Sequence, residues 1–337
     1  MAVMQKLWFF SRDERTHRLF RSSWHHAAEA CGAAVQVVCR GFGASNAFAA
    51  LRVFIGASGH RRVIFGTSEV CLYGAFSGKQ DIWVFTGLGR LLIGNGLTSR
   101  AIRALLRFMY REQMLVVLNE ADREVIQRAI GHNPVVLEGE GYRFPPTPMA
   151  RPARQGLTFA YVGRLLKSKG VDQLVASFAR HSRPDWTLML IGDSDFSNRD
   201  SVPAEQIRDL TQSSQGKIIS TGFRSDVAAL LLEVDVLISL SRREGLPFAI
   251  LDGVAAGAHL VLSPVPGHLS FDSLPGVTFV EPRELGRLFE EISDNTASFL
   301  TFDRAARLAM CEQRFGHDAI TASIKDLLTA PRSALTS

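Results

Sequence analysis

Short runs of β-branched and aliphatic residues recur along the chain, and predicted helices separate them. Continuous apolar runs of this kind are typical of strands that are buried on both faces of a parallel sheet. The runs of the first half lie at residues 7–10, 35–39, 63–66, 82–85, 115–118 and 135–137. Those of the second half lie at residues 158–162, 187–191, 218–221, 236–240, 259–262 and 277–280. Strands that alternate with helices in this order predict an α/β fold with doubly wound parallel sheets.

A proline-rich segment separates the two halves. Residues 144–156 have the sequence FPPTPMARPARQG, and their four prolines exclude a continuous helix or a central strand. We therefore expect two Rossmann-like domains, over residues 1–150 and 151–317, and a C-terminal helix and tail over residues 318–337. Two such domains would face each other across a cleft, with ligands at the carboxyl ends of the strands.

The composition narrows the choice of compartment and partner. The 337 residues suit two domains, and a hydrophobic content of 46% provides for large cores. The apolar stretch at the N-terminus is too short for a signal peptide, and no apolar run has membrane-spanning length. The four scattered cysteines suit a reducing cytoplasm. The net charge of +5 favours the binding of phosphates, nucleotides or an acidic membrane surface. The sequence contains no basic run with interleaved aromatic residues, so it does not indicate a nucleic-acid partner.

Several loops that follow predicted strands of the second half carry residues suited to an anionic ligand. Gly163 and Arg164 follow the first of these strands, and Lys169 precedes the next helix. Arginine can hold two phosphate oxygens at once, and lysine adds a mobile point charge. The alternative interpretation is a polar loop whose charges are solvated.

Two further loops carry an acidic pair and an aromatic residue. Gly192 is followed by Asp193 and Asp195, a spacing that would suit a metal ion on a diphosphate. We favour an acid that caps its own turn, and we expect no metal site. Phe223 follows Gly222 and would lie against a nucleotide base, although a capped helix start would also explain this turn.

A fourth loop precedes a helix of small and apolar residues over 248–256. Pro247 suits the first turn of such a helix, and Gly257 suits its end. The start of the helix would direct N–H groups and a positive dipole end at an anion. Glu244 lies in the loop, and Asp252 is the only charged residue of the helix. These acids would bind sugar or ribose hydroxyls. Alternatively, Asp252 would only face solvent and Glu244 would only interact favourably with the helix dipole.

In their order and spacing, these loops resemble the C-terminal domain of the GT-B glycosyltransferases of family 4, the glycosyl transferases of group 1. The resemblance covers residues 157–290. The residues that carry it are Gly163, Arg164, Lys169, Gly170, Gly192, Gly222, Asp226, Ser241, Glu244, Gly245 and Pro247.

The resemblance implies roles for individual residues. Arg164 and Lys169 would hold the donor diphosphate and stabilise the leaving nucleotide, and Glu244 would contact the donor sugar; these three are the catalytic candidates. The donor-binding candidates are Gly163, Gly192, Asp193, Phe223, Gly245, Leu246, Pro247, Phe248 and Asp252. Asp252 stands where the family usually has a glutamate that binds the ribose hydroxyls, and it is shorter by one methylene group.

The first half resembles the family less closely. Thr86, Gly87 and Gly89 belong to a TGLG sequence similar to one in bacterial members that build cell-surface polysaccharides. These residues would lie on the cleft floor near the donor sugar or the acceptor, although a glycine-rich strand exit is an equal alternative. Arg12 would meet an acceptor phosphate or be an ordinary surface arginine.

The predicted helix over residues 98–113 places four arginines along one face. They are Arg100, Arg103, Arg107 and Arg111, at spacings of three, four and four. Such a face would dock on an anionic inner-membrane surface. A solvated basic face on a helix that packs against the sheet is the favoured alternative.

The resemblance implies a retaining glycosyltransferase that uses a nucleotide-sugar, expected to be UDP-linked. Its acceptor would be a lipid-linked saccharide or polysaccharide of the bacterial surface. The protein would work in the cytoplasm, at the inner face of the cell membrane, without a metal or other cofactor. Two alternatives remain, namely a nucleotide-sugar epimerase on the same fold and a non-catalytic partner subunit. An epimerised free nucleotide-sugar would indicate the first, and binding without turnover would indicate the second.

Overall fold

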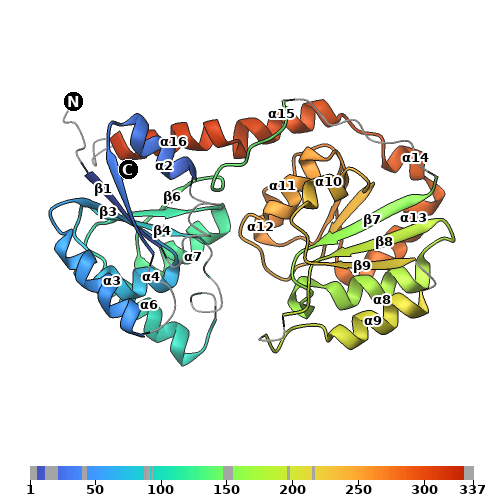
Figure 1. Cartoon of the computed structure of the whole chain (residues 1–337), viewed down its shortest axis with the longest axis horizontal. Helices are drawn as coiled ribbons and strands as arrows, with labels where there is room; N and C mark the ends of the chain where they lie inside the picture. The colour runs from blue at the N-terminus through green and yellow to red at the C-terminus, as the bar shows by residue number, and fades with distance from the viewer. Residues whose placement is uncertain are drawn as a thin grey trace. The chain divides into compact units, whose positions relative to one another are not determined.

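The computed structural model describes residues 6–11, 22–39, 44–86, 88, 92, 94–146, 155–195, 198–214 and 217–329. The chain forms two compact units (Figure 1). The first unit contains Met1–Arg143 and Arg314–Ser337, and the second contains Phe144–Gln313. Each unit is built on its own six-stranded sheet.

The first unit has a parallel sheet with the strand order β2-β1-β3-β4-β5-β6. Successive side chains point to opposite faces, so Phe9 and Phe10 belong to two different hydrophobic clusters. The strands are Lys6–Ser11 (β1), Ala34–Cys39 (β2), Arg61–Phe65 (β3), Ile82–Phe85 (β4), Met114–Val117 (β5) and Val135–Val136 (β6).

Helices cover both faces of this sheet. Those on one face are α3 (Ala44–Gly56), α4 (Thr67–Tyr73), α6 (Leu97–Met109) and α7 (Glu120–Ile130), with the 3-10 turn η1 (Gly74–Phe76). Those on the other face are α2 (Ser22–Ala30) and α16 (His317–Thr329). Helix α7 begins after Asn119, whose side chain accepts a hydrogen bond of 2.8 Å from the amide of Asp122 and so caps the helix N-terminus.

The C-terminal helix α16 belongs to the first unit. Its buried residues, among them Ile320 and Ile324, share a cluster with Trp24 of α2 and with strand residues of the first sheet. The guanidinium of Arg61 donates to the carbonyl of Leu328 at 2.9 Å. The predicted boundaries of 1–150, 151–317 and 318–337 therefore differ from the units of the structure, because the apolar face of this helix completes a core formed by the start of the chain.

The second unit has a parallel sheet with the order β12-β11-β10-β7-β8-β9. Its strands are Leu157–Val162 (β7), Trp186–Ile191 (β8), Ile218–Gly222 (β9), Val236–Ser239 (β10), His259–Leu262 (β11) and Val277–Phe279 (β12). Its helices are α8 (Val171–His181), α9 (Ala204–Ser213), α10 (Val227–Leu231), α11 (Phe248–Ala255), α12 (Pro266–Leu269), α13 (Leu285–Asp294), α14 (Thr296–Phe299) and α15 (Arg304–Phe315), with the 3-10 turns η2 (Lys167–Lys169) and η3 (Pro282–Glu284).

The core of the second unit lies between these helices and the sheet. Helices α8, α9 and α13 contribute to one cluster with β7, β8 and β10. Helix α11 packs against β10 and β11, where Gly253 lies directly on Leu237 and Leu260. The described residues thus contain twelve parallel strands, one at each of the twelve predicted positions, and the expected pair of doubly wound α/β units is confirmed.

His259, at the start of β11, is buried in a cluster of aromatic and cationic side chains. Its ring stacks on Phe299 with centroids 3.9 Å apart, and its Nε2 lies 2.9 Å from the hydroxyl oxygen of Thr278. Burial lowers the pKa of His259 from 6.5 to about 4, and the positive charges of Arg307 and Arg304 add to this effect. The ring is therefore neutral in the folded protein at neutral pH.

The second unit should lose stability as the pH falls from 6.5 to about 4. In this window the unfolded chain binds a proton at His259 and the folded protein does not, so acid favours the unfolded state. The loss approaches about 3 kcal/mol, since one pKa unit corresponds to about 1.4 kcal/mol. Thermal unfolding at both ends of the window measures it. His259→Gln should weaken this dependence and leave the part due to His268, which is also buried with a lowered pKa, whereas the exposed His132→Gln should keep all of it. Equal behaviour of both variants would contradict the assignment.

Candidate functional site

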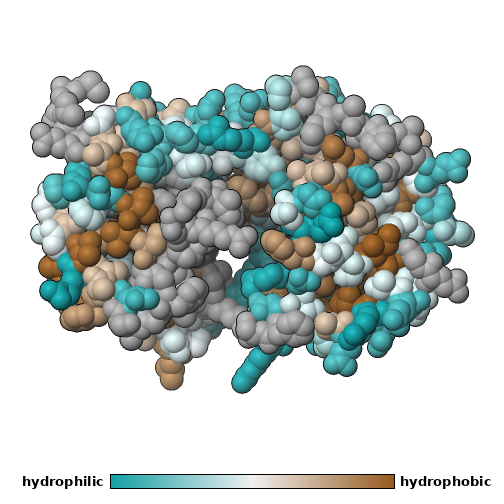
Figure 2. All heavy atoms as spheres, viewed as in Figure 1, coloured by the Kyte–Doolittle hydropathy of each residue, from teal (hydrophilic) through white to brown (hydrophobic). Residues whose placement is uncertain are grey.

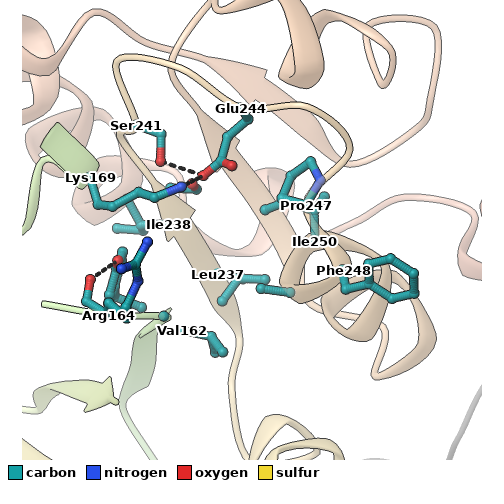
Figure 3. Close-up of a pocket in the computed structure, with 14 residues that line it drawn as sticks. Val162, Arg164, Lys169, Leu237, Ile238, Ser241, Glu244, Pro247, Phe248 and Ile250 are labelled. Carbon is teal, nitrogen blue, oxygen red and sulfur yellow. Dashed lines mark hydrogen bonds and ion pairs between the residues drawn. The ribbon is translucent and has the colours of Figure 1, made fainter. Parts of the chain in front are cut away.

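A pocket of about 220 Å³ opens at the carboxyl ends of β7 and β10 in the second unit (Figure 3). This is the edge at which open parallel sheets bind their ligands. We call it the Lys169 pocket. Its lining residues are Tyr161, Val162, Gly163, Arg164, Lys169, Leu237, Ile238, Ser239, Ser241, Glu244, Pro247, Phe248, Ala249 and Ile250.

Lys169 and Ser241 both point at the carboxylate of Glu244 (Figure 3). The Lys169 ammonium forms an ion pair with Glu244 Oε1, and the Ser241 hydroxyl donates to the same oxygen at 2.7 Å. The Lys169 side chain is 25% exposed and that of Glu244 is 15% exposed. This partly buried pair is screened less by salt than a surface pair, and its charges remain accessible to a ligand in the pocket.

Arg164 follows β7, and its main chain and side chain have different partners. The hydroxyl of Tyr161 donates to the Arg164 carbonyl at 2.7 Å, which fixes the loop. Burial raises the pKa of Tyr161 above its usual range, and the charge of Glu244 adds to the shift, so this hydroxyl stays protonated. The exposed guanidinium of Arg164 pairs with Asp195 at 3.0 Å.

The first turn of α11 forms another wall of the pocket. Pro247 precedes the helix in an extended conformation, and Phe248 is its first residue, as predicted. Pro247, Phe248, Ala249 and Ile250 all line the pocket, so the positive end of the helix lies at this wall. Together with Arg164 and Lys169, this helix end makes the pocket suitable for a polyanion such as a diphosphate.

Buried polar residues support the loop that carries Glu244. Ser263 donates from its hydroxyl to the Ser241 carbonyl at 2.6 Å. The fully buried His268 has its Nδ1 2.9 Å from the Ser263 carbonyl, which requires a proton on Nδ1. Burial lowers the pKa of His268, so the ring is neutral and its Nε2 accepts from the Ser239 hydroxyl at 3.2 Å. This chain of bonds connects α12 with the Glu244 loop.

Two glycines let backbone segments around the pocket touch each other. A Cβ atom on Gly192 would lie 2.0 Å from the carbonyl oxygen of Gly163, and one on Gly267 would lie 1.8 Å from that of Gly245. Atoms cannot approach so closely, and Gly192 also has a φ of +146°. Gly192, predicted to bind a ligand, therefore packs against the neighbouring loop, and Gly267 brings α12 against the Glu244 loop.

The acidic pair after β8 has two separate partners. Asp193 accepts a hydrogen bond of 3.0 Å from the amide of Phe223, across the loop after β9, and Asp195 pairs with Arg164. Asp193 thus bonds to a neighbouring loop and does not cap its own turn. Helix α10, after Phe223, begins without a side-chain cap. Within the described residues, no three His, Cys, Asp or Glu side chains are arranged to hold a metal ion.

The structure brings some of the predicted site residues together and leaves others apart. Gly163, Arg164, Lys169, Glu244, Pro247 and Phe248 all line the Lys169 pocket. The residues that do not line it are Gly192, Asp193, Phe223, Gly245, Leu246 and Asp252. Thr86 lies at the end of β4 in the first unit. Gly87, Gly89 and Arg12 lie outside the described residues.

Sequence reasoning missed part of the site. Tyr161, Ser239 and His268 were not predicted, and Ser241 was counted only as part of the motif. Ser241 could have been found, because it stands three residues before Glu244 in a loop. No sequence signal distinguishes His268, which acts through contacts formed only in the folded unit.

Comparison with known proteins identifies a domain in the second unit. Residues 156–294 match the family described as Glycosyl transferases group 1, a segment that contains every residue lining the Lys169 pocket. No curated protein sequence matches the chain. The match covers the region in which the loop motifs were found.

Solved structures share the fold of the whole chain. HepE from Anabaena, in complex with UDP, has a TM-score of 0.74 at 14% identity, over 96% of this chain and 100% of that chain. The lipopolysaccharide outer core galactosyltransferase WaaB has a TM-score of 0.70 at 14% identity, over 96% and 98%. Sucrose-phosphate synthase from Thermosynechococcus elongatus has a TM-score of 0.71 at 17% identity, over 96% and 98%. The fold is that of the GT-B glycosyltransferases, and the predicted enzyme class, a glycosyltransferase, is confirmed.

Proposed function

We propose that this protein, a glycosyltransferase by its group 1 domain and its GT-B fold, transfers a sugar from a UDP-sugar to a lipid-linked saccharide or polysaccharide. The observation that carries the proposal is the Lys169 pocket. Arg164, the first turn of α11 and the ion pair of Lys169 with Glu244 all line this one pocket. A nucleotide-sugar has the complementary chemistry, namely a diphosphate for the positive groups and sugar hydroxyls for the carboxylate.

Sugar transfer breaks the bond between the anomeric carbon and a phosphate oxygen, and the leaving nucleotide gains negative charge. Arg164 and Lys169 would stabilise that charge, which is the main catalytic effect we assign to the protein. Both cations have carboxylate partners, Asp195 and Glu244, so the diphosphate would exchange with existing ion pairs. Glu244 could then accept hydrogen bonds from the sugar. We propose retention of the anomeric configuration and assign no protein nucleophile.

Residues around the pocket would make the other donor contacts. We propose that Phe223, held by Asp193, contacts the base and that Asp252 binds the ribose hydroxyls. Glycines 163, 192 and 245 and Leu246 would let the backbone approach the phosphates. Thr86, Gly87, Gly89 and Arg12 remain candidates for the acceptor side. No metal or other cofactor is needed, because Arg164 and Lys169 supply positive charge of the kind that a metal ion provides in other enzymes.

Known proteins of the same fold support the choice of donor and acceptor. HepE is solved with UDP and with UDP-glucose, and WaaB is a lipopolysaccharide outer core galactosyltransferase. We therefore propose that this chain is a family 4 enzyme of bacterial surface-polysaccharide synthesis. It would work in the cytoplasm, at the inner face of the cell membrane, where a lipid-linked acceptor can be reached.

A donor screen tests the proposal. The protein is incubated with UDP-sugars and with sugars linked to other nucleotides, with and without a membrane extract as acceptor, and nucleotide release is measured. We expect UDP release that depends on the extract. An epimerised nucleotide-sugar formed without extract would indicate an epimerase instead. Tight binding of UDP-sugars without turnover on any extract would indicate a non-catalytic subunit.

Ser241→Ala should lower kcat/KM for sugar transfer by about 10-fold to 100-fold, because a hydrogen bond to a charged group contributes about 1.5–3 kcal/mol. The variant removes the hydroxyl that donates to Glu244 but keeps the backbone carbonyl that accepts from Ser263. The affinity for UDP, which lacks the transferred sugar that Glu244 would contact, should stay unchanged. Ser168→Ala, in the same turn as Lys169, is the control. Equal kinetics of both variants would show that Ser241 does not position Glu244.

A further inference from the structure

Exposed apolar side chains gather on one part of the first unit. Seven of the eleven exposed large hydrophobic residues among those the structure describes lie on α3, η1 and α6. They are Phe48, Val53, Ile55, Phe76, Leu97, Leu105 and Phe108. Helix α4 packs against both α3 and α6, and η1 packs against α6, so these elements adjoin one another. Figure 2 shows hydrophobic surface in this region, at the lower left. Patches of this kind mark interaction sites.

Helix α6 contributes the most exposed members. Leu97 is 83% exposed, Phe108 is 81% exposed and Leu105 is 42% exposed, whereas Leu106 and Met109 are buried. Leu97, Leu105 and Phe108 are separated by eight and three residues, which puts them on one side of the helix. The apolar residues of α6 thus form two stripes, one against the sheet and one in solvent. Packing of the first unit accounts only for the buried stripe.

Arginines flank the exposed stripe of α6. Arg100 and Arg107 of α6 are exposed, and so is Arg111 in the turn after the helix. The guanidinium of Arg107 donates to the carbonyl of Arg128 at 3.2 Å and stays exposed. Arg103 is only half exposed, because its guanidinium donates to the carbonyls of Leu92 and Gly94 at 2.8 and 2.9 Å. Three of the four arginines predicted on one helix face are therefore exposed, but only Arg100 and Arg107 lie on α6 itself, together with its exposed apolar residues.

The sequence of these helices also lacks acidic residues. Neither α3 nor α6 contains Asp or Glu, and α3 adds the exposed Arg52. A surface that combines apolar side chains with arginines complements anionic headgroups above acyl chains. It fits a second copy of itself poorly, because pairing would bring arginines together. None of the described helices is both long and apolar enough to cross a membrane.

We infer that the outer surface of α6 binds an anionic bilayer. Leu97, Leu105 and Phe108 enter the boundary between headgroups and acyl chains, and Arg100, Arg107 and Arg111 meet lipid phosphates. The inference rests on this surface alone and does not depend on the sugar or on the acceptor.

Vesicle flotation of the full chain tests the inference. Vesicles of phosphatidylcholine are compared with vesicles that also contain phosphatidylglycerol, at low and at high salt. The wild-type protein should bind the anionic vesicles, less strongly at high salt. Leu97→Gln/Phe108→Gln should lower the bound fraction at least about tenfold, since it removes the apolar insertion. Arg100→Gln/Arg107→Gln should lower binding at low salt and weaken its salt dependence.

A matched control removes equal charge elsewhere. Arg180→Gln/Arg208→Gln, at exposed positions of α8 and α9 in the second unit, should bind vesicles like the wild-type protein. All these side chains are exposed, and thermal unfolding verifies that each variant is folded. Three results would overturn the inference: no binding of the wild-type protein to either vesicle, equal losses in the control and the α6 variants, or self-association through α6 without vesicle binding.

Discussion

Replacing Lys169 with alanine is expected to lower kcat/KM for sugar transfer by about 10²–10³-fold, as loss of one charge-stabilising group does in other active sites. The variant removes a cation from the pocket and leaves the Glu244 carboxylate with the Ser241 hydroxyl as its remaining partner in the pocket. The negative charge of the leaving nucleotide would then be stabilised by Arg164 and the helix end alone. Steady-state kinetics of UDP release measures the effect.

Lys167→Ala is a close control for this experiment. Lys167 lies in the same 3-10 turn as Lys169, is exposed, and does not line the pocket. The control should keep near-normal turnover, and both variants should melt like the wild-type protein. Glu244→Ala should lower kcat/KM by a similar factor, and the double variant should be little worse than either single variant, because the two residues act as one unit. Near-normal rates in Lys169→Ala and Glu244→Ala would refute the site assignment.

Replacing Gly267 with alanine is expected to impair the site from outside the pocket. The new methyl group would overlap the carbonyl oxygen of Gly245 and crowd that of Glu244, 2.6 Å away, so the loop that carries Glu244 must shift. A displacement of about 1 Å at a reacting group can cost about 10²-fold in rate. Overpacking of this kind costs about 1–3 kcal/mol of stability.

Kinetics and thermal unfolding together test this second expectation. UDP release is measured at a temperature where the variant is folded, so the loss of stability alone would hardly lower the rate. The expected fall in rate is far larger than that. Gly59→Ala, where a methyl group would have open space, should leave both properties unchanged. A Gly267→Ala protein with normal turnover would mean that the position of the Glu244 loop does not limit the reaction.

The sheets could be predicted from the sequence because their strands are continuous apolar runs. Ile82–Phe85 and His259–Leu262 were predicted with their observed limits, since polar or small residues bound both runs. The loops at the carboxyl ends of the strands were also predictable, because a parallel sheet brings these ends to one edge. Local pattern thus determines which loops contribute to the site.

Helix ends and side-chain partners depend on more distant contacts. The helix predicted to reach Gln113 ends at Met109, because the next residues form a tight turn into β5. In this turn Glu112 has a φ of +64°, and the Gln113 side chain accepts from the amide of Arg111 at 2.5 Å. No periodicity reveals such a turn.

The ion pairs of the site were equally hidden from sequence reasoning. Lys169 and Glu244 are 75 positions apart, and Arg164 and Asp195 are 31 apart. Lys169, Glu244 and Arg164 were each chosen as a separate ligand for a donor molecule. The folded unit instead pairs Lys169 with Glu244 and pairs Arg164 with Asp195, which was not chosen as a ligand. Their pairing follows from the order of β7, β8 and β10 in the sheet, which the strand pattern does not specify.

The return of α16 to the first unit makes the second unit an insertion into the first. The chain leaves the first unit after Arg143 and re-enters it at Arg314. These two points lie next to each other, since the amide of Tyr142 donates to the Phe315 carbonyl at 2.8 Å. An inserted domain whose ends lie close together can often be excised or circularly permuted without loss of its own core. Removal of α16 from the C-terminus, in contrast, would damage the core of the first unit. The residues of this helix complete the core around Trp24, which lies near the other end of the sequence.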